Sequence, residues 1–73
     1  MNFFGSNIKL LRTRKIRTQS DLAAALEIKR TTVNAFENSI SQPTVPQLQS
    51  FSKYFGFAID TLINTYLNKL SES

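Results

Sequence analysis

The stretch TQSDLAAALEIKRTTVNAFEN, residues 18–38, decides the fold that this chain can adopt. Thr18, followed by Asp21 three residues later, matches the pattern that caps a helix start, and the alanines and leucines after it favour a helix. Val33 and Phe36 lie three positions apart, as expected for the inward face of a second short helix. We therefore predict two short helices joined by a tight turn.

Hydrophobic spacing predicts another helix before this stretch. Phe4, Ile8, Leu11 and Ile16 follow a helical period, which places a helix over about residues 3–14. These four side chains are expected to form its inward face.

The second half of the chain predicts two more helices, in addition to the one over about residues 30–37. Thr44 is a good cap for a helix that Gly56 would close in a left-handed conformation. A last helix begins near Ile59, and its apolar spacing continues to Leu70. Because no strand-like alternation appears, we predict an all-α fold of five helices with an extended C-terminal helix.

Length and composition limit the classes of protein that this chain can represent. Its 73 residues allow one domain over 1–73, and 41% hydrophobic residues are enough for a core. Cysteine and histidine are absent, so we expect no disulfide, no metal site and no cofactor. Neither a membrane-spanning run of about 18–20 residues nor a signal peptide is present, so we expect a cytoplasmic protein. Without histidine, cysteine or a phosphate-binding glycine loop, an enzyme is not expected, and no small-molecule ligand is predicted.

Positive charge is concentrated in two places. The net charge is +4, and five of the nine cations lie between Lys9 and Arg17. Lys29 and Arg30 open the second helix of the deciding stretch, close to the small hydroxyls of Thr31 and its neighbour. A helix start of this kind, braced by a preceding helix, is shaped to enter the major groove of DNA. The sequence therefore predicts double-stranded DNA as the partner.

Ordered motifs then extend over about residues 4–63 and leave 64–73 as a C-terminal extension. They are I-x-x-L-R at 8–12, T-Q-x-D-L-A at 18–23, V-x-x-F-E-N at 33–38, P-T-V-x-x-L at 43–48 and F-G-F-A-I-D-T-L-I at 55–63. In this order and spacing they resemble the Cro and phage-repressor type of helix-turn-helix domain, the lambda-repressor-like or xenobiotic-response-element family. The resemblance implies a five-helix domain whose second and third helices form the helix-turn-helix.

The resemblance also implies which side chains would face DNA. The positions that match the groove-facing residues of the family are Lys29, Arg30, Thr31 and Asn34. Among them, Arg30 suits guanine O6 and N7, and Asn34 suits the N6 and N7 edge of adenine. The positions expected to contact phosphate are Gln19, Thr32, Asn38, Ser39, Gln42 and Arg14. Gln19 would also steady a side chain of the recognition helix. The alternative for all of these residues is an ordinary solvated surface.

Three further positions either match the family or depart from it. Arg12 and Glu37 resemble its internal ion pair, for which we expect a structural role. Glu27 stands where the family usually has glycine, and a left-handed conformation would cost it roughly 1–2 kcal/mol, so a rearranged turn is expected. Lys29 replaces the usual serine or threonine cap of the recognition helix.

The apolar C-terminal stripe predicts a homodimer. Its members are Ile59, Leu62, Ile63, Tyr66, Leu67 and Leu70. A twofold dimer would place two recognition helices about 34 Å apart, which is one turn of DNA. In the alternative arrangement, the stripe folds back over Phe3 or Leu10 of its own domain.

We therefore expect a sequence-specific DNA-binding regulator of transcription, acting as a repressor, with activation left open. The alternative is a protein-interaction module, such as an antitoxin component, that uses the C-terminal helix. Residues 29–34 favour the first hypothesis, because a pure interaction module has no need for a cationic helix start that fits the groove.

Overall fold

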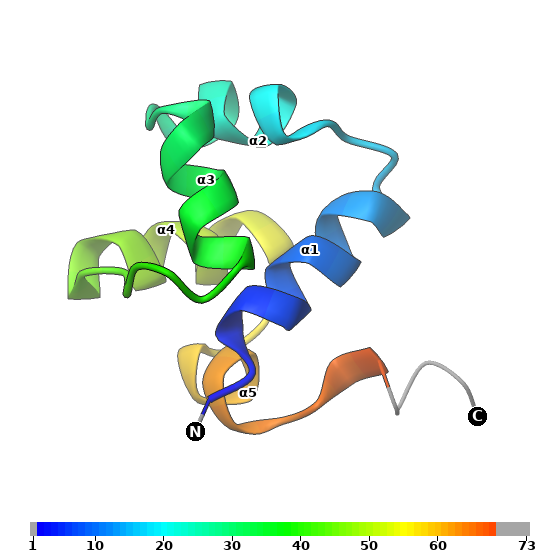
Figure 1. The fold of residues 1–73 in the computed structure, drawn as a ribbon. Coiled ribbons are helices and arrows are strands. Elements are labelled where there is room, and N and C mark those ends of the chain that lie inside the picture. The colour runs from blue at the N-terminus through cyan, green and yellow to red at the C-terminus, as the bar shows by residue number, and fades with distance from the viewer. Residues whose placement is uncertain (1, 69–73) are drawn as a thin grey trace.

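The computed structural model describes residues 2–68 and consists of five helices, with no strand in that part of the chain (Figure 1). The helices are α1 Phe4–Arg14, α2 Gln19–Leu26, α3 Arg30–Glu37, α4 Val45–Phe55 and α5 Ile59–Asn64. The predicted all-α architecture is confirmed, and the first four helices begin and end within about a residue of the expected positions. No helix in residues 2–68 has the length and apolar character needed to cross a membrane.

Helix α3 lies in the middle of the molecule, against α2 and α1, and α5 lies beside the N-terminus (Figure 1). The N-terminal contact is direct, because the Phe3 N–H donates to the Ile63 carbonyl oxygen at 2.7 Å. Gly5 allows α1 to approach the end of α3 closely. A Cβ atom on Gly5 would overlap the Phe36 carbonyl oxygen.

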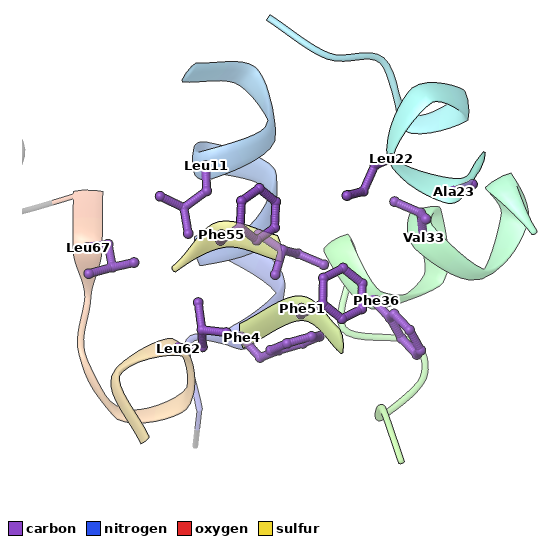
Figure 2. Close-up of a cluster of buried hydrophobic side chains, with 11 residues drawn as sticks. Phe4, Leu11, Leu22, Ala23, Val33, Phe36, Phe51, Phe55, Leu62 and Leu67 are labelled. Carbon is purple, nitrogen blue, oxygen red and sulfur yellow. The ribbon is translucent and has the colours of Figure 1, made fainter. Parts of the chain in front are cut away.

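Three phenylalanines from three helices form the centre of the core (Figure 2). Phe4 of α1, Phe36 of α3 and Phe51 of α4 pack edge to face, with ring centroids 5.2–6.0 Å apart. Such pairs each contribute about 0.5–1.5 kcal/mol beyond the apolar area that they bury. Val33, which is fully buried against α2, adds a second anchor on the same side of α3. The core therefore fixes which face of α3 is turned outward.

Left-handed residues close four helices, and only one of them is glycine. Ile16, Glu27, Ser39 and Gly56 have φ values of 56°, 57°, 59° and 75°. The expectation of a rearranged turn at Glu27 was wrong. Glu27 donates its N–H to the Ala24 carbonyl and Ile28 donates to the Ala23 carbonyl, the pair of bonds that closes a helix in the ordinary way.

Ile16 does not belong to the inward face of α1, contrary to the prediction. The helix ends at Arg14, and the left-handed turn carries the Ile16 side chain into solvent, where it is 88% exposed. The prediction failed because the helical spacing was extended to Ile16, which lies beyond the end of the helix.

The prediction that the last helix continues unbroken past Asn64 was also wrong, because the chain leaves the helix at residues 65–66 before residues 67–68 are helical again. Helix α5 ends at Asn64, and Thr65 is extended, with φ −114° and ψ 130°. The cause is the buried side chain of Asn7, whose amide donates to the carbonyl oxygens of Leu62 and Thr65, each at 2.7 Å. Its own oxygen accepts the N–H of Leu67 at 3.1 Å. Asn7 thus supplies hydrogen bonds that a continuing helix would have made internally.

This turn folds the chain back onto its own domain. Leu62 and Leu67 are buried in the core of the protomer, at 0% and 6% exposure, so neither is available to a partner. Tyr66 packs against Phe3 with ring centroids 5.4 Å apart. The fold-back alternative is therefore correct for Leu67 and Tyr66. Leu70 lies outside the described residues.

Candidate nucleic-acid interface

The outer face of α3 carries the side chains that the sequence singled out for base contact. With Val33 and Phe36 turned inward, Arg30, Thr31 and Asn34 are exposed on the other side of the helix. Lys29, at the N-cap position, is exposed as well and makes no side-chain capping bond. Thr32 is only half-exposed, at the edge of this face.

Behind this face lies the predicted ion pair, which is confirmed. Arg12 Nε contacts Glu37 Oε2 at 2.7 Å and Arg12 Nη2 contacts Glu37 Oε1 at 3.1 Å, a two-bond arrangement. The Glu37 side chain is only 2% exposed. The hydrogen bond with Glu37 raises the pKa of Arg12 above its ordinary value. Because Arg12 neutralises the carboxylate, an acid can lie close to the surface that the sequence predicts to contact phosphate.

Gln19, at the start of α2, connects this ion pair to the outer face of α3. Its Nε2 donates to Glu37 Oε1 at 3.1 Å and to Asn34 Oδ1 at 3.2 Å, and its Oε1 accepts from Arg30 Nη1 at 3.4 Å. The expected steadying role is therefore present in the structure. Both amide hydrogens are in use, so a phosphate contact of Gln19 would come from its main-chain N–H, which has no partner within the helix.

The loop after α3 has fewer free donors than the sequence suggested. The main-chain N–H groups of Asn38, Ser39 and Ile40 all donate to carbonyl oxygens of α3. Asn38 Nδ2 donates to the main-chain oxygen of Asn34 at 2.9 Å and to its Oδ1 at 3.1 Å. The Gln42 side chain meets Asn2 at 3.4 Å. Phosphate contact from this loop would therefore rely on the side chains of Ser39 and Gln42.

Sequence reasoning missed the second role of Asn38, whose side-chain amide donates to the same Asn34 oxygen as Gln19 does. The spacing of two asparagines four positions apart on one helix face could have indicated it. Arg14, the remaining predicted phosphate contact, is exposed at the end of α1. Residues 2–68 contain no group of three acidic, histidine or cysteine side chains that could hold a metal ion.

Two short helices joined by a tight turn, the second with a polar and cationic outer face, define a DNA-binding helix-turn-helix domain. Residues 8–62 match the HTH_3 helix-turn-helix family, and the chain belongs to this Cro/C1-type family. It is a family of DNA-binding transcriptional regulators and not of enzymes.

Individual relatives agree with this assignment. The chain is 34% identical over 61 residues to the HTH-type transcriptional activator BcrR of Enterococcus faecalis, which covers 84% of this chain. It spans only 30% of the length of that relative.

Two solved structures have the same fold. One is a transcriptional regulator from Listeria innocua, with a TM-score of 0.81 and 19% identity over 99% of this chain and 73% of that one. The other is a hypothetical transcription factor, NHTF, from Neisseria, with a TM-score of 0.80 and 22% identity over 97% of this chain and 82% of that one.

Proposed function

We propose that this chain binds a specific sequence of double-stranded DNA in the cytoplasm and regulates transcription there, with α3 in the major groove. The observation that carries the proposal is the outer face of α3. There, Arg30 and Asn34 are exposed to a partner and are also held from behind by Gln19. Side chains that are oriented before binding lose less freedom on contact, which favours specific recognition.

Phosphate contacts around this face would set the register of the domain on DNA without specifying sequence. The proposed contacts come from the start of α2, from the side chains of Thr32, Ser39 and Gln42, and from Arg14. The cations at Lys29 and Arg30 add attraction to the backbone that weakens as salt rises.

The mode of regulation that we propose is repression, because a domain that occupies a promoter excludes polymerase without any further contact. The similar Enterococcus protein is named an activator, and activation would need a surface that contacts polymerase. Transcription from a promoter that carries the selected site, measured with purified polymerase, distinguishes the two. Added protein should lower transcript yield, and a rise would make the chain an activator.

We further propose a homodimer that uses the part of the C-terminal stripe that the core leaves accessible. Ile59 and Ile63 are half-buried and Tyr66 is 43% exposed. The longest dimension of the protomer is 32 Å, so two protomers side by side suit recognition helices about 34 Å apart.

Selection from a random duplex library at physiological salt tests the DNA-binding proposal. We expect one preferred, near-palindromic sequence whose affinity falls steeply between about 50 and 200 mM salt. Steep salt dependence without any preferred sequence would reject specific regulation. If the protein bound no duplex at all, the protein-interaction alternative would be favoured.

A further inference from the structure

We infer that Asn34 contacts guanine and not adenine, because its side-chain amide is held with the oxygen turned inward and the NH2 group outward. The inference rests on the proposed DNA-binding function and adds the base chemistry of one position. It follows from two hydrogen-bond chains, each of which begins at a group that can only accept hydrogen bonds.

The first chain begins at Glu37. This carboxylate pairs with Arg12 through both oxygens, so it is ionised and can only accept hydrogen bonds. The amide group of Gln19 that faces it at 3.1 Å must therefore be its NH2 group. The same NH2 group donates to Asn34 at 3.2 Å, so the atom of Asn34 that receives it must be Oδ1.

The second chain begins at the main-chain carbonyl of Asn34, which also can only accept. Asn38 donates to it at 2.9 Å through Nδ2, which fixes the orientation of the Asn38 amide. That Nδ2 lies 3.1 Å from Asn34 Oδ1 as well. Turning the Asn34 amide over would set its NH2 group against the NH2 groups of both Gln19 and Asn38. The two chains are independent and require the same orientation.

As a consequence, the part of the Asn34 amide that faces outward is its hydrogen-bond donor, the NH2 group. Within residues 2–68, no acceptor bonds Asn34 Nδ2, and the residue is exposed. A bidentate contact to adenine needs one acceptor and one donor from the same amide, and here the acceptor is occupied. Guanine presents two adjacent acceptors, O6 and N7, whereas thymine presents one and cytosine presents a donor. Guanine is therefore the base that this edge fits, in place of the adenine expected from residue type alone.

Selection from a random duplex library with the full chain and with Asn34→Ala identifies the base pair at Asn34, as the position whose preference changes. Competition binding then compares duplexes that carry each of the four bases there. We expect the unaltered protein to prefer guanine over adenine by about tenfold, near the low end of a specific base contact.

Three variants test the cause of this preference. In the double variant Gln19→Ala with Asn38→Ala, the amide is free to turn over, so the preference for guanine over adenine should fall several-fold. In Asn34→Asp, the outward group is an acceptor, so the preference should change to cytosine. Ser20→Ala, on an exposed residue of the same first turn, is the matched control and should leave the ratio unchanged. Thermal unfolding of each variant establishes that it is folded.

Three results would overturn the inference: a preference for adenine in the unaltered protein, an unchanged ratio in the double variant, or no position affected by Asn34→Ala. A protein that selects no sequence at all would instead reject the proposed function. The two failures are therefore distinguishable in one set of measurements.

Discussion

Among single residues, Arg30 is the one that we propose as the main base contact. Its guanidinium lies at the start of α3, exposed, and only one of its nitrogens touches Gln19, at 3.4 Å. The rest of the group remains available for a two-bond contact with guanine. Because Arg30 contributes nothing to the core, removing it should affect binding and not folding.

We predict that Arg30→Ala weakens binding to the selected sequence by about 1–3 kcal/mol and relaxes base preference at one position. Duplex competition measures both effects, and thermal unfolding should show an unchanged midpoint. An unchanged set of selected sequences would mean that another residue is the main base contact.

Glu27 affects the stability of the domain through its backbone conformation. It closes α2 with φ 57° and ψ 43°, a conformation that costs a residue with a Cβ roughly 1–2 kcal/mol. Glycine avoids this cost but loses more freedom on folding. We predict that Glu27→Gly raises the free energy of unfolding by about 1 kcal/mol, measured by urea denaturation. Glu27→Gln removes the charge and keeps the Cβ, so as a control it should show no comparable gain.

At the scale of helices, the pair formed by Arg12 and Glu37 ties the end of α1 to the end of α3, the helix that would enter DNA. A buried ion pair need not add net stability, but losing one partner strands the other charge. We predict that Arg12→Ala or Glu37→Ala alone lowers the free energy of unfolding by about 3–5 kcal/mol.

The double variant Arg12→Met with Glu37→Leu, which replaces both charges by apolar groups, is the informative comparison. Its unfolding free energy should lie much closer to that of the unaltered protein than either single variant does. Single variants as stable as the unaltered protein would show that solvent reaches the pair and screens it.

The hydrogen bonds at the start of α2 predict that acid lowers the stability of the domain. Asp21 accepts the Thr18 N–H at 2.9 Å, and Thr18 Oγ1 accepts the Asp21 N–H at 3.0 Å. The bond from the Thr18 backbone, and then that from its side chain, lower the pKa of Asp21 below its ordinary value. A lowered pKa means that the stabilisation is complete above the unfolded-state value, about 3.9, and is lost as pH falls through the folded-state value.

We therefore predict that thermal stability declines below about pH 4, and that Asp21→Asn makes part of this decline disappear. Melting temperatures measured between neutral pH and acid for both proteins provide the test. If the melting temperature fell equally in acid for the two proteins, the decline would be due to other carboxylates.

At the scale of the whole molecule, the prediction concerns self-association into a homodimer. Tyr66 packs on Phe3 and still exposes 43% of its surface, and Ile63 is half-buried. We predict that the protein sediments as a dimer at micromolar concentration and that Tyr66→Lys shifts it to monomer. Ile40→Lys, on a residue that is 76% exposed and outside the proposed interface, is the control. A monomer in the unaltered protein, alone and on a two-half-site duplex, would rule out the proposed dimer.

Much of this architecture could be predicted because local signals were strong. The caps at Thr18 and Thr44 and the glycine closure at Gly56 each depend on side chains within a few residues. The pattern of Val33 and Phe36 likewise determined which face of α3 would be buried. Local rules failed where distant residues intervened: the Asn7 side chain of α1 donates to the carbonyl oxygens of Leu62 and Thr65, where α5 ends.

The sequence by itself thus determined the first four helices, the start of the fifth, the inward face of α3 and the identity of the residues on its outward face. Only the tertiary structure decided the contact of Gln19 with Asn34 and the burial of Leu62 and Leu67. The physical reason is range: helix propensity and capping act between neighbours in the chain, whereas amide polarity and burial depend on partners that folding brings together. Asn34 Oδ1 is bound by Gln19, 15 positions away, and no local pattern contains that contact.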